Sequence, residues 1–154
     1  MAIQQRFYYA APIQNFLQDQ DSYILGEFVR HHEFELEEPQ KRAWLKQIEL
    51  LKQWLHNLNG TIAFEYPIPR MGKRIDCVVI VNGAIFAIEF KVGSKTYDHH
   101  AIEQVMDYAL DLKNFHEESH RATIIPILIA TQAKDELIEL DIYDYNAGAF
   151  GGEH

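Results

Sequence analysis

The sequence contains one cysteine, Cys77, among 154 residues. A single thiol forms no intrachain disulfide and no zinc site made of several cysteines. Long apolar runs are also lacking, since none approaches the roughly 20 residues that cross a bilayer. The first residues do not contain the apolar core of a secretory signal. We therefore expect neither a disulfide-stabilised domain nor a membrane protein, and we predict a cytoplasmic location.

Positive charge is scarce, because 14 Lys and Arg residues face 23 Asp and Glu residues, for a net charge of -9. This balance argues against a protein that coats nucleic acid by charge alone. The 47% hydrophobic fraction is typical of a globular core, and the length suits one domain. We predict a single domain over 1–140, with a helical extension in 1–40 and an acidic, then glycine-rich, tail or linker over 141–154.

Apolar side chains recur every three or four residues over 40–58, which predicts an amphipathic helix. The pattern then changes to strands over 61–66, 75–81 and 84–92. Asn82-Gly83 separates the last two strands and is a strong hairpin signal.

A second amphipathic helix is predicted over 99–118, and a further strand over 123–130. Pro126 lies in that strand and favours an edge position or a bulge, since proline cannot donate a ladder hydrogen bond. The order of elements predicts an α/β fold with a mixed central sheet, in which a hairpin is followed by a crossover helix.

Ionisable residues lie in the two hairpin strands where packing alone would favour apolar ones. Asp76 is six residues before Asn82, and Glu89 is six residues after Gly83. Equal arms of a hairpin bring these two carboxylates to the same end, unless the register slips by one residue. Lys91 is two residues beyond Glu89 and therefore lies on the same strand face.

Two carboxylates that converge repel one another unless a cation lies between them. Oxygen ligands with open positions suit Mg²⁺ or Mn²⁺, which can activate water and neutralise a phosphate. The alternative is a Glu89–Lys91 ion pair on a solvent-exposed strand face, which is the usual fate of such a pair. The apolar surroundings in both strands favour the chemical interpretation slightly.

The segments Arg74-Ile75-Asp76 and Glu89-Phe90-Lys91 resemble the signature of the PD-(D/E)XK nuclease superfamily. In that signature an acidic residue on one strand is followed, on the next, by Asp or Glu, any residue and Lys. The predicted order of elements is similar to the α-β-β-β-α-β core of that family. The resemblance implies a restriction-endonuclease-like fold, with Ile75 in place of the usual proline.

The stretch from Ile62 to Thr131 is similar to one subgroup, the nuclease-like domain at the N-terminus of predicted bacterial helicase proteins. This resemblance implies an ATPase or helicase domain as a neighbour or partner. The matching segments are Phe64-Glu65-Tyr66, Ile68-Pro69-Arg70, Gly72 to Asp76, Glu89 to Gly93, Gln104-Val105 and Asp107 to Leu112, with Arg6 to Tyr9 and Ala43-Trp44 earlier in the chain.

The resemblance also implies roles for individual residues. Asp76 and Glu89 would hold Mg²⁺ or Mn²⁺, with the carbonyl of Phe90 as a further ligand, and Lys91 would steady the attacking water or the transition state. Glu49 is the candidate for an additional ligand from the first core helix, although a solvated helix glutamate is the more common case. On the second helix, Gln104 would orient the phosphate or Lys91, supported by Tyr108, and an ordinary helix boundary is the alternative for both.

Basic residues gather around this block, since the stretch 70–95 has five of them against two acids, in a chain whose net charge is -9. This asymmetry favours a phosphate-facing patch on an acidic body, and the alternative is a solvated turn. The predicted substrate-binding residues are Arg70, Lys73, Arg74, Lys95 and Tyr108.

We therefore expect a Mg²⁺- or Mn²⁺-dependent nuclease that acts on nucleic acid, DNA rather than RNA. A rival hypothesis is a non-cleaving module on the same fold that binds nucleic acid or docks an ATPase partner. A third is a structural building block that forms a homodimer.

Overall fold

The computed structural model describes residues 7–32, 35–68, 72–92, 95, 99–115 and 123–131. The described residues form β1 (Tyr9–Pro12), α1 (Ile13–Gln18), α2 (Asp21–His31), α3 (Glu38–Trp54), β2 (Thr61–Ile68), β3 (Lys73–Val81), β4 (Ala84–Lys91), α4 (His99–Phe115) and β5 (Thr123–Ala130). The predicted tail at 141–154 lies outside the described residues.

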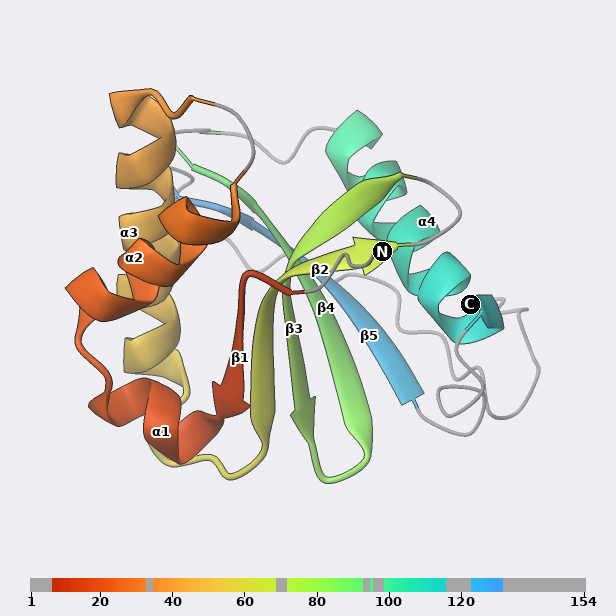
Figure 1. The fold of residues 1–154 in the computed structure, drawn as a ribbon. Helices are drawn as coiled ribbons and strands as arrows, with labels where there is room; N and C mark the ends of the chain where they lie inside the picture. The colour runs from red at the N-terminus through yellow and green to blue at the C-terminus, as the bar shows by residue number, and fades with distance from the viewer. Residues whose placement is uncertain are drawn as a thin grey trace, which may run out of the picture.

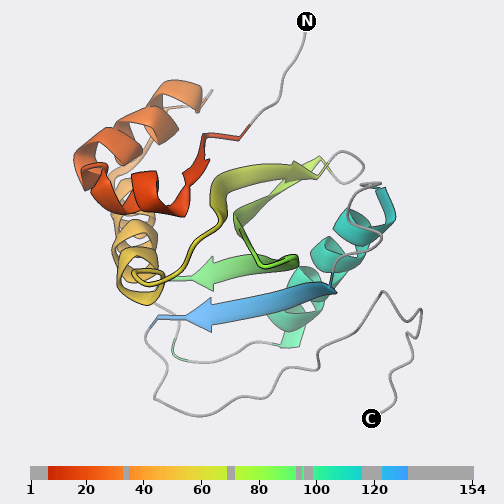
Figure 2. The same cartoon turned by 90° about the horizontal axis from the view of Figure 1, so that it is seen from below.

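The strands make one mixed sheet in the order β1-β2-β3-β4-β5. The pairs from β1 to β4 are antiparallel, and β5 runs parallel to β4 after the crossover through α4. Helices α1, α2 and α3 cover one face and α4 covers the other (Figures 1 and 2). The predicted α/β class with a mixed sheet, a hairpin and a crossover helix is therefore confirmed.

The β3–β4 hairpin turns at Asn82 and Gly83, whose φ angles are 51° and 80°. Positive φ at both central residues is what a type I′ turn requires, and Asn-Gly tolerates it best. The ladder pairs Val81 with Ala84, so the register predicted from this turn does not slip.

Strand β1 was not expected, since the sequence pattern predicted only helices in 1–40. The strand is four residues long, and it exists because Tyr9 to Pro12 pair with β2. The strand predicted over 61–66 is longer than expected, since β2 continues through Pro67 to Ile68. The pairing of β1 stops at Tyr9 and Phe64, so Pro67 lies where β2 has a ladder partner only on the β3 side. The predicted edge position of Pro126 is confirmed, because β5 is the last strand of the sheet.

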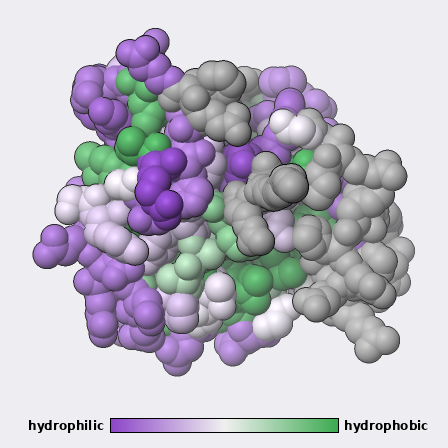
Figure 3. Space-filling model, in the orientation of Figure 1, coloured by the Kyte–Doolittle hydropathy of each residue, from purple (hydrophilic) through white to green (hydrophobic). Residues whose placement is uncertain are grey.

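Each face of the sheet has its own hydrophobic cluster. The larger one packs α1, α2 and α3 against the sheet through side chains such as Phe28, Trp44, Ile48 and Phe64. The other packs α4 against the opposite face through residues such as Tyr108 and Ala109. At the left of Figure 3 hydrophilic side chains are interrupted by a hydrophobic group. The helices α2 and α3 accordingly expose the large apolar side chains Tyr23, Val29, Leu45 and Trp54.

Among the described residues, no helix is both long and apolar enough to cross a membrane.

Candidate functional site

The ladder between β3 and β4 stops at Cys77 and Ile88, one step before Asp76 would face Glu89. Beyond this point the carboxylates of Asp76 and Glu89, instead of backbone carbonyls, accept hydrogen bonds from the facing strand. The backbone N–H of Asp76 donates to Oε1 of Glu89 at 2.8 Å, and the N–H of Phe90 donates to Oδ2 of Asp76 at 2.8 Å. The two carboxylates therefore meet at the open end of the hairpin, as the equal arms predict.

A bulge in β2 lies opposite Asp76. The ladder pairs Phe64 with Cys77 and Tyr66 with Ile75, which leaves Glu65 and Asp76 between them unpaired. Glu65 has φ 56°, a left-handed value that is uncommon for a residue other than glycine. Bulges of this kind bend a strand and redirect its side chains.

The redirection is visible in β3, where two residues that flank Asp76 pack on opposite faces. Ile75 belongs to the cluster under α4, whereas Cys77 belongs to the cluster under α1 to α3. A regular strand would place these residues on one face, because they are two apart. Asp76 thus lies at the point where β3 changes face and the strands separate.

Burial raises the pKa of each carboxyl group in this region. Desolvation raises the pKa of Asp76 to about 6, against the smaller effects of the Phe90 N–H and of Lys91, which lower it. Desolvation, then the charge of Asp76, raises the pKa of Glu89 to about 8. The same two causes raise the pKa of Glu65 to about 8, while Arg74 and a hydrogen bond from Trp44 lower it. The site therefore holds excess negative charge whenever these groups ionise.

Lys91 does not neutralise Glu89 as an ion-paired partner. Glu89 is only 6% exposed, and the part of the chain that the structure describes contains no salt bridge to Lys91. The alternative of a solvent-exposed Glu89–Lys91 ion pair is therefore wrong. Lys91 is close enough to lower the pKa of both carboxyl groups, so its charge acts on the site from a short distance.

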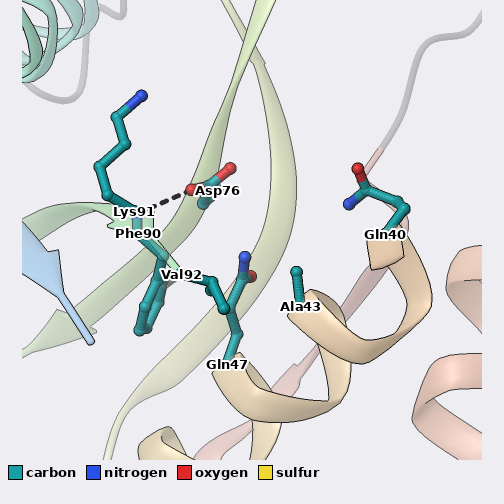
Figure 4. Close-up of a pocket in the computed structure, with 7 residues that line it drawn as sticks. All are labelled: Gln40, Ala43, Gln47, Asp76, Phe90, Lys91 and Val92. Atoms are coloured by element: carbon teal, nitrogen blue, oxygen red, sulfur yellow. Dashed lines mark hydrogen bonds between the residues drawn. The ribbon is translucent and has the colours of Figure 1, made fainter. Parts of the chain in front are cut away.

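A pocket of about 510 Å³ opens beside Asp76 (Figure 4). One wall is α3, which contributes Gln40, Ala43 and Gln47, and the other is the hairpin end. The hairpin end contributes Asp76, Phe90, Lys91 and Val92. Access to Asp76 therefore lies between α3 and the open end of the hairpin, where β3 begins and β4 ends.

The opposite side of the site is formed by α4. Nε2 of Gln104 donates to the hydroxyl of Tyr108 at 2.8 Å, and Tyr108 is buried. Burial and then the charge of Glu89 raise the pKa of Tyr108 to about 12. Tyr108 thus lies within electrostatic reach of Glu89, and Gln104 is hydrogen-bonded to that tyrosine.

The structure does not bring Glu49 into the pocket. Glu49 is exposed and its carboxylate lies 3.5 Å from Nζ of Lys46 on the same helix. The buried side of α3 contains Trp44, Gln47, Ile48 and Leu51, and Glu49 lies about 200° around the helix from Gln47. The residues of α3 that line the pocket opposite Asp76 are instead Gln40, Ala43 and Gln47, of which only Gln47 is on the buried side of the helix.

The predicted basic residues differ in their surroundings. Arg74 is turned inward, since its Nη1 donates to the carbonyl of Glu65 at 2.6 Å and its guanidinium lies 4.7 Å from the centre of the Tyr8 ring. Lys73 and Lys95 are exposed, and Arg70 lies outside the described residues. The half-buried Arg74 therefore holds the bulge opposite Asp76.

Three residues of the site were missed by the sequence analysis: Gln40, Gln47 and Glu65. The helical period could have found Gln47, because it follows Trp44 by three residues on the buried face of α3. No sequence pattern around Glu65 predicts the bulge.

The residues present fit a divalent cation in part. Oδ1 of Asp76 and Oε2 of Glu89 have no hydrogen-bond partner among the described residues, so one oxygen of each carboxylate is available. A cation would also offset the repulsion that raises the pKa of Glu89. No group of three or more His, Cys, Asp or Glu side chains suited to a metal occurs in the described ranges, so the set of charged ligands stops at two.

Comparison with known proteins found no match among family models, curated proteins or solved structures.

Proposed function

We propose that this chain is a metal-dependent nuclease with a restriction-endonuclease-like core. The observation that carries the proposal is the pairing of the half-buried Asp76 with the buried Glu89 at the open end of a hairpin beside Lys91. Desolvation disfavours the ionised form of both groups, and the charge of Asp76 disfavours that of Glu89 further. Chemistry is a common reason for tolerating such a cost. The order α3-β2-β3-β4-α4-β5 also supports the proposal, because it is the order expected of that core.

Asp76 and Glu89 would hold Mg²⁺ or Mn²⁺ through their available oxygens, with the carbonyl of Phe90 as a further ligand. When bound, the ion supplies charge neutralisation at the scissile phosphate and a more acidic water. The backbone N–H groups of Asp76 and Phe90 fix the two carboxylates from opposite strands, so little reorganisation is needed.

Lys91 would act on the reacting phosphate. Its charge already lowers the pKa of both carboxyl groups, which shows that it lies within electrostatic reach of the site. An ammonium at this place would stabilise the negative charge that develops on the phosphate or orient the attacking water. Gln104 and Tyr108 would keep the α4 side of the site in place through their hydrogen bond.

The test is cleavage of supercoiled and single-stranded DNA with Mn²⁺, Mg²⁺ or EDTA, by the wild type, Lys91→Ala and Glu49→Gln. We expect metal-dependent cleavage that falls by about 10²–10³ in Lys91→Ala, as when one oxyanion-stabilising group is removed. Glu49→Gln is the matched control, because Glu49 is exposed and outside the pocket, and it should cleave like the wild type.

Equal cleavage by the wild type and Lys91→Ala would refute the assignment of the site. Binding of DNA without any cleavage would favour the non-cleaving module, or an enzyme that depends on an ATPase partner. The same assay with RNA decides whether DNA is the preferred substrate. Sedimentation at increasing concentration tests the homodimer.

A further inference from the structure

Gln47 is a buried polar side chain that lacks hydrogen-bond partners among the described residues. The residue is only 5% exposed, and its Oε1 is sealed from solvent without a hydrogen-bond donor. An orphaned acceptor of this kind is destabilising, and replacement by an apolar side chain of similar size would remove the cost. Packing alone therefore does not explain a glutamine at this position.

The other end of the carboxamide faces the pocket. Figure 4 shows the Gln47 side chain extending from α3 into the pocket, with its nitrogen at the tip. No hydrogen bond from this nitrogen to any described residue is present. The orientation thus directs two N–H donors toward the space beside Asp76 while the oxygen remains buried.

A second glutamine side chain on α3 lines the same pocket. Gln40 lines the pocket two helical turns before Gln47, which separates the two positions by about 10 Å along the axis. Ala43 lies between them, and its small side chain leaves room for a ligand. Lys91 on the facing wall is a further donor. Neutral amide donors opposite a lysine form a surface that matches an anionic oxygen, because phosphate oxygens accept hydrogen bonds and donate none.

We propose that Gln47 binds a backbone phosphate oxygen of the nucleic-acid strand that enters this pocket. The inference rests on the proposed function, to which it adds α3 as the wall that holds the substrate. A neutral donor contributes a hydrogen bond but releases no counterion, so its part of the affinity does not depend on salt.

The experiment measures binding of fluorescein-labelled single-stranded and duplex oligodeoxynucleotides, with Ca²⁺ and with EDTA, over a range of salt concentrations. We expect Gln47→Leu to weaken binding roughly tenfold or more with an unchanged salt slope, as for a hydrogen bond to a charged group. Lys73→Ala is the comparison, since an exposed lysine that contacts phosphate would lower the slope by about 0.7–0.9 when removed.

Thermal unfolding distinguishes a role of Gln47 in binding from a role in stabilising the fold. Gln47→Leu deletes the orphaned oxygen, so we expect its Tm to rise by a few degrees, on the order of 2–4 °C, while binding weakens. A fall in Tm together with weaker binding would mean that the glutamine only supports the fold, and the proposal would be overturned.

Gln47→Glu separates a phosphate contact from a metal contact. An added carboxylate should repel the phosphate and weaken binding further than Gln47→Leu does. If Gln47→Glu instead tightens Mn²⁺ binding in a calorimetric titration and restores DNA binding, the side chain faces the cation and the proposal is wrong.

Failure of the two proposals is distinguishable. Metal-dependent cleavage with undiminished binding by Gln47→Leu would overturn the role of Gln47 and leave the nuclease in place. Binding that depends on Gln47 without any cleavage, also after an ATPase partner is supplied, would leave this role in place and overturn the nuclease. A wild type that binds neither oligodeoxynucleotides nor oligoribonucleotides would overturn both.

Discussion

Replacing Glu89 by glutamine should make the protein more stable at alkaline pH and leave it unchanged at acidic pH. The amide keeps an oxygen that can accept the hydrogen bond from the Asp76 N–H, so the hairpin end stays closed. What the variant loses is a buried charge whose formation the fold opposes through desolvation and through the charge of Asp76.

The magnitude follows from the pKa of Glu89, which the fold raises from 4.5 to about 8. This difference is about 3.5 pKa units, and one unit corresponds to about 1.36 kcal/mol. Ionisation of Glu89 therefore lowers the free energy of unfolding by at most about 5 kcal/mol. The folded state holds the proton more tightly than the unfolded chain, so stability is greatest below the unfolded pKa. Stability then declines as pH rises through the folded pKa, which places the window between about pH 4.5 and 8. A change of this size is a large fraction of the roughly 5–15 kcal/mol by which a domain is stable, so unfolding experiments would detect it.

The assay is urea unfolding in EDTA from pH 5 to pH 9, for the wild type, Glu89→Gln and Glu49→Gln. The wild type should lose stability with rising pH and Glu89→Gln should lose less. The pH-dependent difference between the two should shrink to about 1 kcal/mol or less by pH 5. Glu49→Gln should follow the wild type, because Glu49 is exposed. Parallel curves for the wild type and Glu89→Gln across the whole range would refute the reasoning.

Other predictions concern residues around the site. Arg74→Met should destabilise the fold by about 2 kcal/mol in urea unfolding, because it removes a charged donor from the Glu65 carbonyl and a cation from the Tyr8 ring; weaker DNA binding with unchanged stability would instead make Arg74 a substrate contact. Ala43→Phe should fill the pocket and weaken oligonucleotide binding about tenfold with little change in Tm, and unaltered binding would place the nucleic acid elsewhere. Mn²⁺ at about 100 times its Kd should stabilise the wild type by about 2.7 kcal/mol at pH 8 and stabilise Asp76→Ala much less, as thermal unfolding with and without EDTA would measure.

The sequence alone was sufficient for much of the core around the site. Asn82-Gly83 defined the hairpin, because few other dipeptides tolerate positive φ at both turn positions. Once the turn was known, counting equal arms brought Asp76 and Glu89 together, since antiparallel strands advance at the same rate. The amphipathic periods of α3 and α4 located both helices to within a few residues.

Other features were decided by contacts between residues far apart in the chain. Strand β1 is too short to be recognised by its own pattern, and it forms because β2 offers an edge for Tyr9 to Pro12. Glu65 adopts a left-handed φ because the pairs on either side of it are held by β3 and because Arg74 binds its carbonyl.

The same distinction applies to the candidate site. The residue types at 76, 89 and 91 and their order along the chain were readable from the sequence, because a hairpin relates them locally. Which residue of α3 faces them was not, since it depends on how that helix is rotated against the sheet. Burial of Trp44, Ile48 and Leu51 decides the rotation, turns Gln47 toward Asp76 and leaves Glu49 in solvent. Local geometry thus determined the pair of carboxylates, and packing of the hydrophobic core determined what surrounds them.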